Sequence, residues 1–166
     1  DYVNTHTDLS DELYREGKLV SDNYKNILRS QTNAAAIPAD VTVRYGVTVR
    51  RANLRNLPTG EGLFFYASDR NFDALQETAL DPGEAVAILH TSTNGYFYYV
   101  QAYNYRGWLS KFDVAETDRS TWLRYAEPKN FLTVVAKDYT LKADGAQVLF
   151  QQGARLQLAD KKASAY

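Results

Sequence analysis

Cysteine is absent from this chain of 166 residues, and histidine occurs only at His6 and His90. The lack of cysteine excludes a disulfide framework, a thiolate metal site and a cysteine nucleophile. No Gly-x-Ser-x-Gly motif is present to position a serine nucleophile, and no His or carboxylate cluster has the spacing of metal ligands. We therefore expect no catalytic residue, no metal and no cofactor in this chain, and a structural role for His90.

The chain also lacks an excess of charge of either sign and a long apolar run. It has 19 Lys and Arg against 20 Asp and Glu, a net charge of −1, whereas nucleic-acid binders usually concentrate basic residues. No apolar segment approaches the roughly 20 residues that cross a bilayer. Nucleic acid is thus not an expected partner, and no membrane span is expected. Hydrophobic residues make up 45% of the chain, enough for a packed core.

Short apolar runs separated by turn residues fill the sequence from residue 46 to residue 109. Leu54 is expected to point into a core while Arg55 points out, and Pro82-Gly83 marks a turn before the apolar run 85–89. Asn94-Gly95 is the strongest short hairpin signal, so residues 96–100 should return antiparallel to 85–91. Gly107 should clear space for Trp108 beside a neighbouring strand.

The order of these residues resembles the bacterial SH3 (SH3b) modules found beside cell-wall hydrolases, over residues 45–115. Within that group it is most similar to the first SH3b domain of NlpC-type cysteine peptidases, which cleave peptidoglycan stem peptides. The resemblance is carried by Val49-Arg50-Arg51, Asn53-Leu54-Arg55, Pro58-Thr59, Asp73, Gln76, Gly83-Glu84, Ile88-Leu89-His90-Thr91-Ser92, Gly95 and Gly107-Trp108. It implies a mainly β fold with an SH3-like small barrel, in a secreted protein at the cell wall or cell surface.

Three segments are expected along the chain. Residues 1–40 should form a helical N-terminal clip, with one helix at 8–16 and a second at 21–31 capped by Ser21. Residues 41–128 should form the first SH3b-like barrel, with a long RT-type loop between Pro58 and Pro82 and a short helix or turn after Thr117 or Ser120. Asp69 could cap a short helix in the loop.

Residues 129–166 repeat the opening half of the barrel pattern. A strand is expected from Phe131, a tight turn at Asp144-Gly145, and a further strand at 148–150. The aromatic hairpin and Gly-Trp pair of a second module do not follow before Tyr166. We therefore interpret this segment as an incomplete second SH3b-like module and expect residues beyond 166, or a companion chain, to complete it.

Aromatic residues are abundant, with 13 Tyr, and binding surfaces use Tyr heavily because it joins apolar area to a hydrogen-bonding tip. Alternation should place 96, 98 and 100 on one face of their strand, and 97 and 99 on the other. Whether the rings bind a ligand or only cover the barrel is left open by the sequence. The candidate ligand-binding residues are Tyr66, Phe72, Tyr96, Tyr98, Tyr103 and Trp108.

The resemblance also implies a function. In that family the first SH3b domain packs against the peptidase and helps to wall its substrate groove, and the corresponding loop here runs from Tyr66 to Phe72. We therefore expect a non-catalytic module that binds peptidoglycan stem peptide or glycan. Its expected partner is a peptidase domain on the same or a companion chain. The alternative is an extracellular protein-interaction or sensor domain that uses the same aromatic surface.

Overall fold

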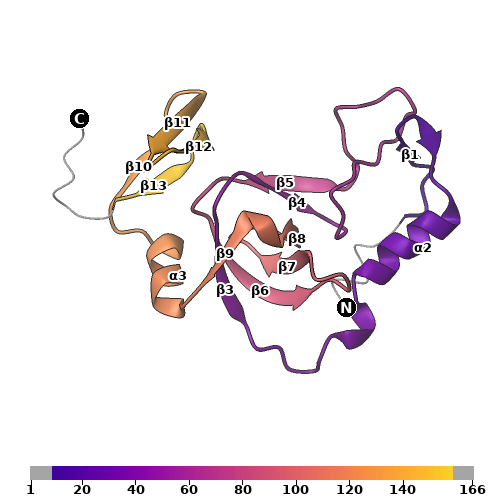
Figure 1. The fold of residues 1–166 in the computed structure, drawn as a ribbon, viewed down its shortest axis with the longest axis horizontal. Coiled ribbons are helices and arrows are strands. Elements are labelled where there is room, and N and C mark those ends of the chain that lie inside the picture. The colour runs from indigo at the N-terminus through magenta and orange to yellow at the C-terminus, as the bar shows by residue number, and fades with distance from the viewer. Residues whose placement is uncertain (1–8, 159–166) are drawn as a thin grey trace.

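The computed structural model describes residues 9–158, and an antiparallel sheet of seven strands lies at its centre (Figure 1). The strands lie in the order β5-β4-β8-β7-β6-β3-β9. Their bounds are β3 Arg44–Thr48, β4 Ala52–Arg55, β5 Gln76–Leu80, β6 Ala85–Thr91, β7 Phe97–Gln101, β8 Arg106–Ser110 and β9 Val114–Thr117, with a short 3₁₀ turn η2 at Lys111–Asp113. The mainly β fold with an SH3-like barrel is confirmed.

The inside of the barrel is apolar because alternate residues of each strand point inward. Leu54, Val86, Ile88 and Val100 are almost completely buried there, together with Leu109. The expected alternation in β7 is present: Tyr98 packs against this cluster, whereas Phe97 and Tyr99 belong to a second one on the other face.

Two glycines fit the expected backbone. Gly95 has φ 72°, a value that suits glycine, and the hairpin after β6 pairs Thr91 with Tyr98. At Gly107 a Cβ atom would lie 2.7 Å from the carbonyl oxygen of Arg55. Gly107 therefore allows β8 to approach β4, as well as leaving Trp108 its place in the core.

The N-terminal segment matches one of its two expected helices. Helix α2 (Asp22–Gln31) begins where Ser21 accepts a hydrogen bond from the backbone N–H of Tyr24, as expected of an N-cap. A 3₁₀ turn, η1 (Ala34–Ala36), follows. Residues from this turn cover Tyr99 and Trp108 on the outer face of the barrel.

The helix expected at 8–16 is wrong. A hairpin of β1 (Tyr14–Arg15) and β2 (Lys18–Leu19) occupies the C-terminal part of the expected helix. The turn of this hairpin has φ 51° at Glu16 and 80° at Gly17. Leu9 and Leu13, whose spacing suggested a helix, are both buried against the barrel's long loop. Packing onto that loop, rather than helical periodicity, therefore determines the backbone here.

The expected helix after the barrel is present. Helix α3 (Arg119–Ala126) begins at Asp118, whose side chain accepts from the N–H of Thr121. The indole N–H of Trp122 donates to the carbonyl oxygen of Val86 at 3.0 Å, which attaches the helix to β6. None of its side chains is fully buried.

The C-terminal strands form two separate pairs. Strand β10 (Phe131–Thr133) pairs with β13 (Arg155–Gln157), and β11 (Asp138–Ala143) pairs with β12 (Ala146–Gln151). The predicted turn at Asp144-Gly145 is confirmed by φ values of 49° and 79°. Between 129 and 158 no closed barrel is formed. That this is part of a second SH3b module stays a prediction, as do the boundaries at 40 and 128.

Candidate functional site

The long loop between β4 and β5 is held by a buried ion pair. Arg55 was expected to point outward, and this is wrong: only 4% of the residue is exposed. The register of β4 shifts between Leu54 and Arg55, and such a bulge can place two successive side chains on the same side. The Arg55 guanidinium lies 2.7 Å from a carboxylate oxygen of Asp73 and donates to the carbonyl oxygen of Glu61 at 2.6 Å.

Asp73 organises the loop from its other end. Its Oδ1 accepts hydrogen bonds from the backbone N–H groups of Leu63, at 3.1 Å, and of Leu75, at 3.0 Å. One carboxylate therefore fixes the base of the loop at two points and also neutralises Arg55. The prediction that Asp69 caps a short helix is wrong, because the described loop between β4 and β5 contains no helix. Asp69 instead accepts from the N–H groups of Asn71 and Phe72 and caps a turn.

The N-terminal hairpin holds the loop from outside. Tyr14 and Phe64 exchange two backbone hydrogen bonds, 2.7 and 2.9 Å long. Arg15 donates to a carboxylate oxygen of Glu61 at 2.8 Å, and the hydroxyl of Tyr24 donates to the same oxygen. The N-terminal segment thus braces the loop as well as the barrel.

Three aromatic rings of this braced loop remain accessible: Phe65 is 50% exposed, Tyr66 72% and Phe72 78%. We call these three residues the loop aromatic surface. Two of them, Tyr66 and Phe72, are predicted site residues. Binding residues occur disproportionately on loops held by a rigid scaffold, so these exposed rings are candidates for a binding surface.

The other predicted site residues lie elsewhere. Tyr96 lies beside Phe112, with their ring centres 6.0 Å apart. Tyr98 donates its hydroxyl to Glu116 at 2.7 Å and lies under the guanidinium of Arg44, so its polar tip and one face are occupied. Burial and the hydrogen bond to Glu116 raise the pKa of Tyr98. The six candidates therefore do not form one surface.

Trp108 was predicted to bind a ligand, and this prediction is wrong. Its side chain is 0% exposed and packs against Tyr99, with ring centres 5.2 Å apart. Residues of the N-terminal linker, including Ala34 and Ile37, cover this pair. An indole enclosed in this way belongs to the core and cannot contact a ligand at the surface.

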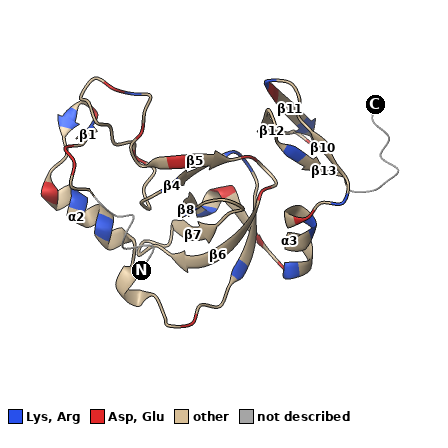
Figure 2. Ribbon diagram, turned by 180° about the vertical axis from the view of Figure 1, so that it is seen from behind, with Lys and Arg blue, Asp and Glu red and all other residues tan. Residues whose placement is uncertain are grey.

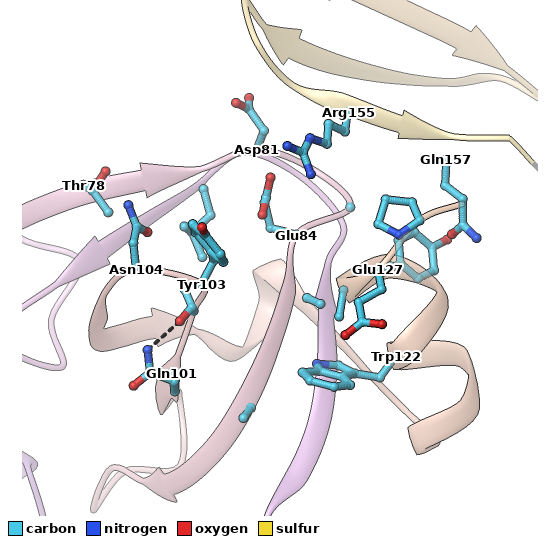
Figure 3. Close-up of a pocket in the computed structure, with 18 of the residues that line it drawn as sticks. Thr78, Asp81, Glu84, Gln101, Tyr103, Asn104, Trp122, Glu127, Arg155 and Gln157 are labelled. Atoms are coloured by element: carbon cyan, nitrogen blue, oxygen red, sulfur yellow. Dashed lines mark hydrogen bonds between the residues drawn. The ribbon is translucent and has the colours of Figure 1, made fainter. Parts of the chain in front are cut away.

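A pocket of about 820 Å³ lies between the barrel, helix α3 and strand β13 (Figure 3). Tyr103, on the turn between β7 and β8, is the only predicted site residue among those that line it, and it is 96% exposed. Glu84 faces the pocket from the turn before β6. Burial and the charge of Asp81 raise the pKa of Glu84, and Arg155 acts in the opposite direction.

Sequence reasoning found the turn at Glu84 but not the pocket. The walls of the pocket come from β5, the β7–β8 turn, α3 and β13. No local sequence pattern indicates that these segments meet. Figure 2 shows acidic and basic residues interspersed along the chain rather than gathered by sign. Within residues 9–158, no group of three or more His, Asp and Glu could hold a metal ion, and no helix is long and apolar enough to cross a membrane.

The comparisons with known proteins support the resemblance seen in the sequence. Residues 63–110 match the model of the SH3 domain of the SH3b1 type. The matched segment runs from the long loop through β8, so the loop aromatic surface and the turn that carries Tyr103 both lie within or on this domain. The recognition of an SH3b domain is therefore confirmed.

A solved structure of an NlpC/P60 endopeptidase from Photobacterium damselae subsp. piscicida has a similar fold. The match covers 94% of this chain with a TM-score of 0.73 and 20% sequence identity. It covers 36% of the endopeptidase chain, so this chain spans about a third of that protein's length. At this identity the likeness concerns the fold. No curated protein matches the chain significantly.

Proposed function

We propose that this chain is a non-catalytic accessory module of a secreted murein peptide hydrolase, which binds peptidoglycan and shapes the substrate groove of the peptidase. Its site of action is outside the cell, at the wall or the cell surface. Its partner is an NlpC-type peptidase domain on the same polypeptide or a companion chain. The SH3b match and the fold shared with an NlpC/P60 endopeptidase support this role.

The observation that carries the proposal is the loop aromatic surface on its buried ion pair. A flexible loop would lose conformational entropy on binding, which weakens association. Here the pair between Arg55 and Asp73 and the hairpin contact at Phe64 already fix the loop's base. The exposed rings of Tyr66 and Phe72 can therefore contact a stem peptide, or line a groove for it, at a small entropic cost.

Sedimentation with purified peptidoglycan tests the proposal. The wild-type chain should pellet with the polymer at low and moderate salt, because contacts of exposed rings depend little on ionic strength. The double variant Tyr66→Ala and Phe72→Ala should pellet much less and should unfold at an unchanged urea concentration, since both side chains are exposed. Tyr139→Ala, which removes a half-exposed ring from β11, is the matched control.

Two results would argue against the proposal. If the wild-type chain stays in the supernatant at every salt concentration, it does not bind the wall polymer. If the loop double variant pellets as well as wild type, binding does not use this loop.

A second candidate function is an extracellular protein-interaction domain, and a separate surface supports it. Tyr96 and Phe112 are both more than half exposed, and the ammonium of Lys111 lies 5.6 Å from the ring centre of Tyr96 and 5.7 Å from that of Phe112. Exposed rings beside a cation suit a protein partner. Failure of the wild-type chain to sediment with peptidoglycan would favour this function over wall binding, and Tyr96→Ala, unlike the loop double variant, should then lose binding to the protein partner.

A further inference from the structure

The pocket beside helix α3 has a small apolar floor and aromatic walls. Ala79, Ala85 and Ala87 line it from the barrel strands β5 and β6. Trp122 from helix α3 also lines it; its N–H donates to the carbonyl oxygen of Val86, and its ring centre lies 5.2 Å from that of Tyr45. Because these contacts fix Trp122 in place, the pocket exists before any ligand binds.

Tyr103 stands at the other side of the pocket on a braced turn. The side-chain amide of Gln101 donates to the carbonyl oxygens of Ala102 and Tyr105, and the N–H of Ala102 donates to Tyr105 at 2.8 Å. Tyr103 itself is almost fully exposed, and it lines the same pocket as Glu84 (Figure 3). An exposed ring on a rigid turn is available to stack on a ligand.

Glu84 supplies a hydrogen-bond acceptor that the described residues leave unused. No residue in the described part of the chain donates a hydrogen bond to its carboxylate, although the group is partly buried. The nearby Asp81 differs, because it accepts from the guanidinium of Arg51 and from the backbone N–H of Gln151, both at 3.1 Å. A ligand with hydroxyl or amide donors would therefore compensate for the burial of Glu84.

These features together describe a site for a sugar. A pyranose ring has apolar C–H faces, which stack on aromatic rings, and hydroxyl groups around its edge, which bond to carboxylates and amides. In this pocket Tyr103 can stack on the face of a pyranose, and the Glu84 carboxylate can accept hydrogen bonds from its hydroxyl groups. The pocket volume of about 820 Å³ lies in the range of ligand sites. We propose that this pocket binds a glycan segment of at least two pyranose rings, separately from the loop aromatic surface.

This inference rests on the proposed function for the choice of polymer, since the glycan strand of peptidoglycan carries such rings. Strand β5 begins where the loop ends, and its last residues line the pocket. The two surfaces could therefore contact the peptide and the glycan of one polymer.

Titration of the whole chain with a soluble N-acetylglucosamine tetramer, followed by amide chemical shifts, tests the inference. Shifts should move at residues 83–87 and 102–104. Tyr103→Ala should weaken binding about fivefold through loss of a stacked ring. Glu84→Gln should weaken it about tenfold through loss of a charged acceptor. Tyr139→Ala and Glu77→Gln, which alter an exposed Tyr and Glu outside the pocket, should bind as wild type.

No shift change at these residues in the wild-type chain, or equal binding by Tyr103→Ala and wild type, would overturn the inference. Neither result touches the proposed function, which fails only if the chain does not sediment with peptidoglycan or sediments without using its loop.

Discussion

The ion pair between Arg55 and Asp73 should contribute strongly to stability, unlike an ordinary surface pair. The two side chains are 5% and 16% exposed and their charged atoms lie 2.7 Å apart. Removing one partner of a buried pair leaves an uncompensated charge and typically costs about 3–5 kcal/mol. An exposed pair contributes about 0–1 kcal/mol. Asp73→Asn should fall at the lower end of the first range, about 3 kcal/mol, because its amide oxygen can still accept from Leu63 and Leu75.

A double-mutant cycle separates the pair from the other contacts of each residue. The three variants are Asp73→Asn, Arg55→Met, which keeps an apolar stem, and the two combined. We expect the double variant to lose less than the sum of the single losses, with a coupling energy of about 2 kcal/mol. The assay is urea unfolding followed by tryptophan fluorescence, with the slope m compared among variants.

A coupling energy below about 0.5 kcal/mol would refute the reasoning, because that is the behaviour of a solvent-exposed pair. The pair is also expected to matter for binding. Asp73→Asn should weaken sedimentation with peptidoglycan under conditions where the variant remains folded, since the loop aromatic surface would lose its fixed base.

Three further predictions concern single residues. Gly107→Ala should destabilise the chain by about 2–4 kcal/mol in thermal unfolding, because the new Cβ would lie 2.7 Å from a backbone oxygen; an unchanged melting temperature would contradict the close approach of β4 and β8. The folded-state pKa of Glu84 is raised above its ordinary 4.5, so the stability that this carboxyl contributes is lost as pH rises from below 4.5 through that raised pKa. Glu84→Gln should therefore be more stable than wild type at pH 7 and equal to it below about pH 4; equal stability at both pH values would refute this sign. Trp122→Phe should cost about 1 kcal/mol in urea, by loss of its hydrogen bond to Val86, and no cost would contradict the attachment of α3.

Turns and caps could be predicted from the sequence because their causes are local. Asn94-Gly95 and Asp144-Gly145 tolerate positive φ, and Ser21 supplies an oxygen to the first turn of α2. The alternation of β7 was predictable for the same reason, since strand side chains point to opposite faces wherever the strand lies.

Other features depend on contacts between distant residues. The spacing of Leu9 and Leu13 fits one face of a helix, but the same two side chains can also be buried beneath a loop, as they are here. Arg55 follows Leu54, which points into the core, so regular alternation predicts that Arg55 points outward. Its burial is explained by the bulge in β4 and by the carboxylate of Asp73, which comes from a distant part of the chain. Trp108 was expected to be accessible, but the N-terminal linker covers it.

The most direct test of the account is to map where a soluble fragment of peptidoglycan, a disaccharide carrying its stem peptide, contacts the isotope-labelled chain. We expect amide shift changes in residues 61–75, around the loop aromatic surface, together with changes at 83–87 and 102–104 where the disaccharide would enter the pocket, and no change in the fragment's own covalent structure during the titration. Shift changes confined to the neighbourhood of Tyr96 and Phe112, or cleavage of the fragment by the chain, would contradict it.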